Sequence, residues 1–290
     1  MKLLTKFNLI LLVLFLTGGL VISQVIYSFL ISNARREVLQ EAELMMASAR
    51  SVRDYTSSDL GPLLQQNPQH QKRFLSETVP AFGAITIFNK LRQNYPEYAY
   101  REATLNPTNP EHRAADWEND VIGYLRDHPD QKRLTGERDT PLGPSMYLAT
   151  PIAVTSPCLE CHSSPAAAPP AMIATYGSSN GFGWKSGTIV GAQIVSVPMS
   201  LPLQKAKQAF HLLVIYLLVT LIATLAVLDA AVYMIVIRPL KLVSEAADRV
   251  SKGETQVPPL AVKGSDEIAT VTASFNRMQM SLAKAFKMLE

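Results

Sequence analysis

Residues 146–162 read MYLATPIAVTSPCLECH and contain the only two cysteines of the chain. The first nine residues are rich in apolar and β-branched side chains, which favours a β-strand. Cys158, Cys161 and His162 follow in the spacing C-x-x-C-H, which is typical of c-type haem attachment. In such a site the two thiols bind the haem vinyl groups and the histidine becomes an axial ligand of the iron. The sequence therefore predicts one covalent haem c per chain.

Other interpretations of the two cysteines are weaker. A structural zinc site normally needs four Cys or His ligands, and here only His162 adds to the pair. A thioredoxin-type redox pair belongs near a βαβ pattern and does not require the following histidine. A plain disulfide within a chance C-x-x-C-H motif is the third alternative.

Two long apolar runs predict two membrane-spanning helices. The first covers residues 7–31, follows two lysines and is long enough to cross a bilayer. It exceeds the apolar part of a secretory signal and lacks an A-x-A cleavage pattern, so we expect an uncleaved anchor. The second covers residues 210–237 and is followed by Arg238. Asp229 lies toward the end of this second run, where an interfacial position is the simplest expectation.

Charge at the ends of these runs predicts the topology. Basic residues at both outer flanks place both termini, residues 1–6 and 238–290, in the cytoplasm. Arg35 and Arg36 lie just after the first run, on the opposite side of the membrane, and they weaken this charge difference without reversing the predicted topology. Residues 32–209 then lie outside the cytoplasm, where haem c is attached, so motif and charges agree. We expect a two-pass protein of a bacterial inner membrane with a periplasmic haem domain.

The composition fits two spans and one domain of moderate size. Hydrophobic residues make up 48% of the chain and the net charge is +3. There is no concentrated basic patch with interleaved aromatic residues, so a nucleic-acid partner is not expected. No Ser-His-Asp order, paired acid motif or Gly-rich phosphate loop stands out, so the sequence does not indicate an enzyme.

Between the two runs, the segment pattern favours an α+β domain. Helices are predicted for residues 33–64, 71–94 and 111–127, and the first of them continues the membrane run outward. Strands are predicted for residues 98–103, 146–154 and 188–197. Helices first and antiparallel strands later are typical of the α+β class.

Two amphipathic segments follow the second run. After a break rich in glycine and proline, apolar residues recur at alternating intervals of three and four positions, as in a coiled-coil seam. They are Ile268, Val271, Phe275, Met278, Leu282, Ala285 and Leu289. Neither helix could bury its apolar stripe alone, so we expect a homodimer with a parallel four-helix bundle.

This order of features resembles a HAMP domain. Pro239 lies just after the membrane helix, a Gly-bearing connector follows, and Asp266-Glu267-Ile268 opens the second helix before Phe275-Asn276-Arg277-Met278. The resemblance implies that Glu267 helps to couple the membrane helix to the bundle. It also implies a switch element that transmits a change in helix packing.

The segment from about residue 40 to 200 resembles the c-type haem sensor domains of PAS-like fold that bacteria place between two membrane helices, formerly a domain of unknown function. The resemblance lies in Val79-Pro80-Ala81-Phe82-Gly83, in Asp116-Trp117-Glu118 after Asn106-Pro107, in the strand leading to Cys158, and in Asn180-Gly181-Phe182-Gly183-Trp184-Lys185. It implies a PAS-like haem sensor joined to the membrane at both ends.

The sixth ligand of the iron is left open by the sequence. Some relatives use a cysteine on the N-terminal helix, and this chain has no third cysteine. Tyr55 lies about where that helix would face the haem, and tyrosinate is a known haem ligand. An open position that binds a gas is equally compatible with the sequence. The other extracytoplasmic candidates are Met146, Met172, His70, His112 and His128.

Three further residues are candidates for contact with haem. Arg50 and Arg53 could pair with the propionates, because guanidinium matches carboxylate geometry. Trp184 could pack on the macrocycle. Solubilising surface charge is an equally good explanation of the two arginines.

These features predict a haem sensor that passes redox or gas-ligand state through HAMP. No output domain follows Glu290, so we expect the output to belong to a separate kinase or chemoreceptor-type protein, to a heterodimer partner that shares the HAMP bundle, or to a region lost from a longer relative. The alternative is a membrane-anchored c-type cytochrome for electron transfer, although a simple carrier does not need HAMP. A scaffold that recruits a kinase whatever the haem state is a third hypothesis.

Overall fold

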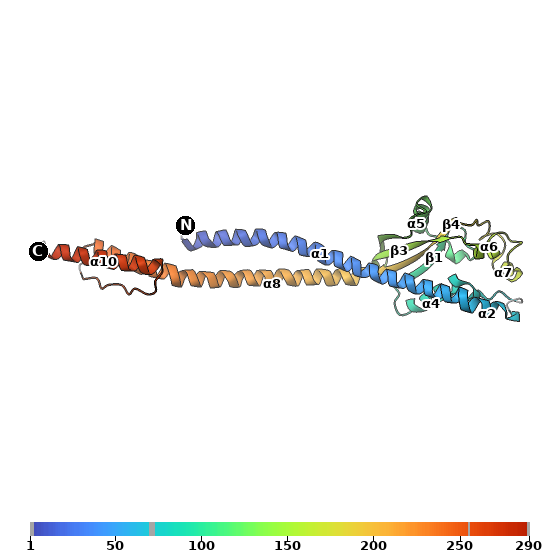
Figure 1. The fold of residues 1–290 in the computed structure, drawn as a ribbon, viewed down its shortest axis with the longest axis horizontal. Coiled ribbons are helices and arrows are strands. Elements are labelled where there is room, and N and C mark those ends of the chain that lie inside the picture. The colour runs from blue at the N-terminus through green and yellow to red at the C-terminus, as the bar shows by residue number, and fades with distance from the viewer. Residues whose placement is uncertain (1–2, 70–72, 255, 289–290) are drawn as a thin grey trace. The chain divides into compact units, whose positions relative to one another are not determined.

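The computed structural model describes residues 3–69, 73–254 and 256–288 (Figure 1). Two compact units are present. One is the segment Ile26–Ala209, and the other joins Met1–Val25 with Phe210–Glu290. We describe each unit by itself.

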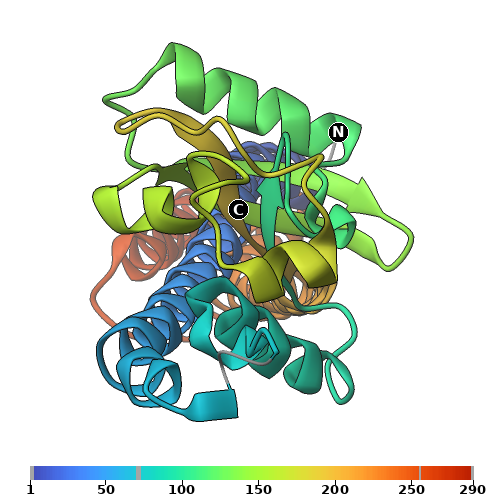
Figure 2. The same cartoon turned by 90° about the vertical axis from the view of Figure 1, so that its right-hand side faces the viewer.

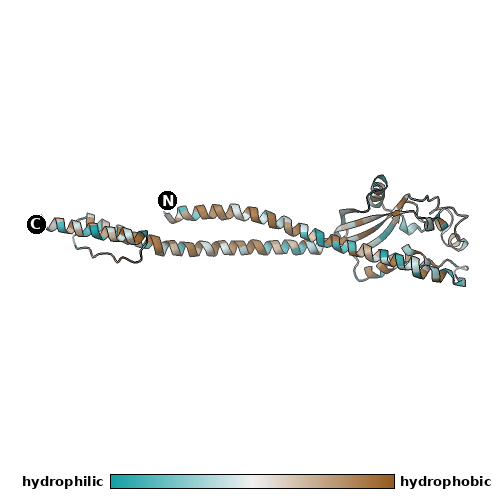
Figure 3. Ribbon diagram, viewed as in Figure 1, coloured by the Kyte–Doolittle hydropathy of each residue, from teal (hydrophilic) through white to brown (hydrophobic). Residues whose placement is uncertain are grey.

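Two helices are long and apolar enough to cross a membrane by length and composition. They are α1 (Leu3–Tyr55) and α8 (Ser200–Val232). Figure 3 shows apolar residues along α8 and the first part of α1. None of the most apolar stretch of either helix is buried, as expected for side chains that face lipid. One polar contact interrupts this pattern, because Asp229, expected to be interfacial, accepts a hydrogen bond from Asn8.

The unit Ile26–Ala209 is built on one antiparallel sheet of four described strands, in the order β1-β4-β3-β2. The strands are β1 (Ala99–Thr104), β2 (Leu134–Thr140), β3 (Gly143–Ala153) and β4 (Ile189–Pro198). Together with the helices around it, this sheet confirms the predicted α+β class.

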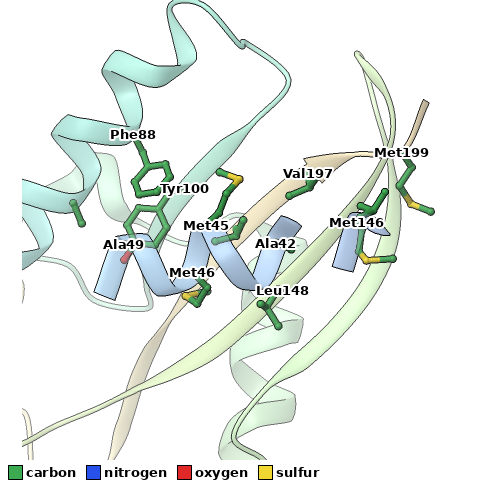
Figure 4. Packing of buried hydrophobic residues seen from close by; sticks show 13 residues of the cluster. Ala42, Met45, Met46, Ala49, Phe88, Tyr100, Met146, Leu148, Val197 and Met199 are labelled. Atoms are coloured by element: carbon green, nitrogen blue, oxygen red, sulfur yellow. The ribbon is translucent and has the colours of Figure 1, made fainter. Parts of the chain in front are cut away.

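Helices cover both faces of the sheet. On one face, α1 and α4 (Pro80–Arg92) pack on a cluster that includes Met45, Phe88 and Leu148 (Figure 4). On the other face, α5 (Asp116–Asp127) packs through Ile122 and Leu125. Figure 2 shows α5 on the opposite side of the sheet from α1 and α4. The strands alternate between these two cores, which fixes which residues point toward α1.

Several element boundaries differ from the predicted ones. The helix predicted for residues 71–94 begins at Pro80, because proline fixes the first turn and restricts the preceding residue to an extended conformation. The helix predicted from residue 111 begins at Asp116, after a short 3-10 turn at Pro110–His112. After Tyr55, α1 continues as a π-helical turn, Thr56–Leu60, and then as α2 (Gly61–Gln65).

The strand β2 was not predicted. It lies at the edge of the sheet, where its LTGERDT sequence is alternately half-buried and exposed. Edge strands tolerate charged residues, so the apolar signal used to find strands is weak here.

The helices of the other unit follow the second span. A π-helical turn, Tyr233–Ile237, leads into α9 (Arg238–Ser251), and α10 (Glu267–Lys287) comes after an extended connector. Ala246, Val257 and Phe275 form a small core between the two helices and the connector. Asn276 fixes the connector, because its amide accepts from the backbone N–H of Leu260 and donates to the carbonyl of the same residue, at 3.0 and 2.8 Å.

Candidate functional site

The C-x-x-C-H motif forms a short helix, α6 (Ser156–His162), directly after β3. Pro157 lies in its first turn, where a proline costs no helical hydrogen bond. Cys158 and Cys161 are three positions apart and therefore lie on the same side of the helix. Both thiols are free and partly exposed. Burial raises the pKa of the Cys161 thiol.

The imidazole of His162 is oriented by the loop that follows α7 (Pro170–Tyr176). Its Nδ1 lies 2.7 Å from the carbonyl oxygen of Gly181. A carbonyl can only accept, so Nδ1 carries the proton and Nε2 keeps its lone pair. Burial lowers the pKa of His162, and the bond to Gly181 partly opposes this effect. The ring is therefore presented as a neutral ligand through Nε2, the form in which histidine binds metals.

Trp184 comes from the same loop and stacks on the imidazole. The ring centroids are 4.0 Å apart and the planes are inclined by 13°. Two backbone hydrogen bonds join the loop to the end of α6, from Trp184 to the His162 carbonyl and from Gly183 to that of Ser163, at 3.2 and 3.1 Å. The histidine is thus held by a carbonyl at one edge and by an indole on one face.

A close approach of two backbone segments explains the glycine at position 181. Gly181 has a φ of +83°, and a Cβ there would lie 2.1 Å from Oγ1 of Thr108. The Thr108 hydroxyl is also 3.4 Å from Nδ1 of His162. Only glycine allows the loop after β1 to lie against the loop that holds the histidine.

A buried ion pair joins α1 to β1. Arg53 of α1 pairs with both carboxylate oxygens of Glu102 on β1, and Tyr100 donates to the same carboxylate at 2.7 Å. Burial alone lowers the pKa of Arg53, but the charges of Glu102, Tyr100 and Cys158 raise it above the ordinary value. Burial and Glu102 raise the pKa of Tyr100.

Polar residues extend from this ion pair across the sheet. Gln193 lies opposite both Glu102 and Thr150, so three strands contribute one buried polar row. Thr150 donates to Gln193 at 3.3 Å. The buried hydroxyl of Thr104, on the same side of β1, has no hydrogen-bond partner among the described residues. The end of the sheet that holds Glu102, Gln193 and Thr150 is therefore polar, whereas the opposite end is apolar.

The remaining residues predicted to contact haem differ in how exposed they are. Arg50 is exposed, and Tyr55 has 59% of its surface exposed at the end of α1. In the described part of the chain, no hydrogen bond or ring contact joins Tyr55 to His162. Met172 is buried in α7, the short helix that follows the motif.

The other candidate sixth ligands lie in different places. Met146 packs in the apolar core next to Met199, at the end of β3 opposite the motif (Figure 4). His128 is exposed and stacks on Tyr124. His112 is half-buried, and burial lowers its pKa while the charge of Glu102 opposes this shift. His70 falls outside the described residues.

The donor set fits a covalently attached haem c. Two free thiols lie on one side of a helix, and the adjacent histidine keeps Nε2 available. The described residues hold no group of three or more His, Cys, Asp or Glu side chains suited to a metal ion. Sequence reasoning missed Gly181, Thr108 and Glu102, because each acts through a contact with a residue distant in sequence.

Comparison with known proteins identifies the family. Residues 31–198, more than half of the chain, match the family model described as Tll0287-like. The chain belongs to the Tll0287-like family. The Tll0287-like domain is followed by a HAMP domain, which matches residues 231–284. The predicted HAMP domain is thereby confirmed, and together with two helices able to span a membrane it fits a membrane protein.

One solved structure is similar to the Tll0287-like domain. It is the crystal structure of the cyanobacterial heme-protein Tll0287, which is 13% identical with a TM-score of 0.43, over 56% of this chain and 95% of that one. No curated protein matches the chain.

Proposed function

We propose that this chain is a non-enzymatic membrane sensor that holds a covalent haem c in its Tll0287-like domain and passes the redox or gas-ligand state through HAMP. The observation that carries the proposal is the geometry of His162. A carbonyl fixes Nδ1 at 2.7 Å, a parallel indole covers the ring, and two free thiols lie within the preceding turn.

Each residue of the motif has a distinct role in this proposal. Cys158 and Cys161 would hold the haem through thioether bonds, and His162 would bind the iron through Nε2. When bound, the haem supplies one-electron redox chemistry and a position at iron where a gas can bind. Trp184 restricts rotation of the imidazole and shields it from water.

The arginines have unequal roles. Arg50 is exposed and free to pair with a propionate. Arg53 is already neutralised by Glu102, so it can serve a propionate only by sharing its guanidinium or by exchanging partners. Tyr55 and His112 remain candidate sixth ligands, and the side chain of Tyr55 is exposed at the end of α1.

The chain offers a short route from the site to the membrane. The loop that holds His162 leads into β4, and β4 leads into α8 through a single residue, Met199. Met199 is buried, and its N–H donates to the carbonyl of Pro144 at 2.9 Å. A displacement of β4 therefore moves the start of α8 without a flexible linker to absorb it. Such a shift requires two states that differ in interaction energy at the haem.

The proposal includes a location and partners. Residues 1–6 and 238–290 lie in the cytoplasm, residues 7–31 and 210–237 span the bacterial inner membrane, and residues 32–209 form the periplasmic sensor. HAMP forms a homodimer, and a separate kinase or chemoreceptor-type protein receives the signal. The apolar seam of α10 supports the dimer, because Val271 and Met278 are 45% and 51% exposed in the single chain.

A membrane-anchored electron-transfer cytochrome is the second candidate. The partly exposed motif favours it, because electron transfer requires access to the haem edge. The two candidates differ in whether the cytoplasmic helices respond to haem state. Hydrogen exchange in α9 and α10, measured with oxidised and reduced protein, changes for a sensor and stays constant for a carrier.

The experiment that tests the haem is optical absorption of the purified full-length protein, produced in cells that can attach haem c. A c-type spectrum and a haem-stained band on a denaturing gel are expected for the wild type. Both are expected to be lost in a variant with Cys158→Ser and Cys161→Ser. A wild-type protein without a c-type spectrum contradicts the proposal. Spectra recorded with carbon monoxide or nitric oxide then distinguish gas sensing from redox sensing.

A further inference from the structure

A polar contact joins the two candidate membrane helices. Nδ2 of Asn8 on α1 donates to Oδ2 of Asp229 on α8 at 2.9 Å. The two residues are 221 positions apart and meet because the chain enters and leaves the apolar region at the same end. Around them the side chains are those of lipid-facing helices, with Leu9 and Val227 largely exposed.

This contact leaves two acceptors unsatisfied. Oδ1 of Asn8 and Oδ1 of Asp229 are buried and have no hydrogen-bond partner among the described residues. An amide nitrogen has two N–H groups, and the bond to Asp229 uses only one of those on Asn8. Each chain therefore holds one unused donor next to two unused acceptors. The acceptor atoms are enclosed in the single chain, but both side chains are only half-buried overall, so a rotation of the side chains brings these groups to the helix surface. Polar groups without partners are costly in a bilayer, because lipid tails offer no hydrogen bonds.

A second copy of the same chain matches this pattern. In a twofold arrangement the same surface occurs on both sides, so a donor on each copy can meet an acceptor on the other. The apolar seam of α10 in the same unit points to the same occupant. Val271, Met278 and Leu282 are 45%, 51% and 39% exposed although they follow a coiled-coil spacing. The unsatisfied polar groups and the exposed apolar seam would both gain partners from a second copy of the helices that carry them.

We propose that Asn8 and Asp229 form an intramembrane contact between two copies of this chain, in which the second N–H of Asn8 donates to Asp229 of the other copy. The contact deepens the proposed dimer and rests on it, and it does not depend on haem. It forms a ring of four polar side chains, two from each copy, near the end of α8 that leads into α9. A change in α8 then reaches HAMP through a fixed point shared by both copies.

The test measures dimerisation of the full-length chain in liposomes. Each chain carries a C-terminal fluorescent protein, and energy transfer is followed as the protein is diluted with lipid. Asn8→Leu and Asp229→Leu are each expected to raise the apparent dissociation constant about 3- to 30-fold, the range for hydrogen bonds between membrane helices. The exchanged variant, Asn8→Asp with Asp229→Asn, keeps both donors and acceptors and is expected to restore dimerisation.

The matched control is Thr17→Val. The hydroxyl of Thr17 bonds only to carbonyl groups of its own helix, at Val13 and Leu14. It is therefore expected to leave the dissociation constant unchanged. A wild-type dimer that persists unchanged in both leucine variants overturns the membrane contact and leaves the HAMP dimer intact. A monomeric wild type overturns both, and the optical spectrum of the same samples reports separately on haem.

Discussion

The imidazole ring of His162 lies parallel to the indole ring of Trp184, with centroids 4.0 Å apart and planes inclined by 13°. The same tryptophan donates its backbone N–H to the carbonyl of His162 at 3.2 Å. One residue thus restrains both the backbone and the ring of the proposed iron ligand.

Replacing Trp184 is expected to weaken retention of His162 at the iron in acid. Aromatic stacking contributes about 0.5–1.5 kcal/mol, and protons compete with iron for Nε2. Trp184→Ala is therefore expected to raise the pH midpoint of histidine release by about 0.4–1 unit. The measurement is an optical titration of the oxidised protein. Trp184→Phe keeps a ring and is the control, and equal midpoints in all three proteins contradict the role of the indole.

Substitution of Gly181 tests whether the loop positions the histidine. Gly181→Ala introduces a Cβ 2.1 Å from Oγ1 of Thr108 at a φ of +83°. Gly183→Ala is the matched control, because Gly183 also has a positive φ but nothing within 4 Å of a new Cβ. Both variants carry backbone strain of about 1–3 kcal/mol. Only Gly181→Ala is expected to lower the ratio of attached haem to protein, measured by absorbance, since only it displaces the carbonyl that orients His162.

The ion pair of Arg53 and Glu102 is expected to contribute to stability far more than an exposed pair does. The side chain of Glu102 is 5% exposed and that of Arg53 is 25% exposed. Removing one partner of a buried pair costs about 3–5 kcal/mol, because the other charge is left uncompensated. Arg53→Ala is therefore expected to lower the unfolding free energy strongly, as measured by the melting temperature of the full chain.

The control for this prediction is the pair of Arg133 and Glu43. Its side chains are 61% and 43% exposed, and such pairs contribute about 0–1 kcal/mol. Arg133→Ala is expected to change the melting temperature little. The double variant of Arg53→Met and Glu102→Leu is expected to be more stable than Arg53→Ala alone. If Arg53→Ala and Arg133→Ala have the same melting temperature, the buried pair contributes no more to stability than the exposed one.

The raised pKa of Tyr100 leads us to expect that the folded chain loses stability at alkaline pH. Burial and the neighbouring Glu102 raise the pKa of its phenol above the ordinary value near 10. The unfolded chain therefore loses this proton at a lower pH than the folded chain does. The contribution to stability is complete below about pH 10 and is lost as pH rises above it. Melting temperatures measured from pH 8 to 11 are expected to fall less steeply for Tyr100→Phe than for the wild type.

The sequence was sufficient for features that depend on local pattern. The apolar runs, the C-x-x-C-H spacing and the seam from Ile268 to Ala285 are properties of short segments, and the structure has helices at each of them. Three of the four strands in the described part of the chain were predicted for the same reason. Edge strand β2 was missed because its exposed side carries charged residues.

Contacts between distant segments could not be predicted in this way. Arg53 was considered as a contact of a propionate or as a solubilising surface charge, and it pairs with Glu102, 49 positions away. Asp229 was expected to be interfacial, and its partner is at the other end of the chain. Pairing of this kind depends on the register of helices against strands, for which a single sequence carries no local signal. The fit of Gly181 against Thr108 is of the same type.

Asn276 is expected to hold the HAMP connector in place. Its amide makes two hydrogen bonds to the backbone of Leu260, at 3.0 and 2.8 Å. Asn276→Ala removes both and leaves two backbone groups to water, at a cost of about 1 kcal/mol per bond. The amide of Leu260 is therefore expected to exchange with deuterium faster by about tenfold or more. Arg277→Ala is the control, because Arg277 is exposed and its guanidinium bonds only to Ser274, at 2.9 Å. Equal exchange at Leu260 in both variants means that the small core around Val257 and Phe275 holds the connector without the amide.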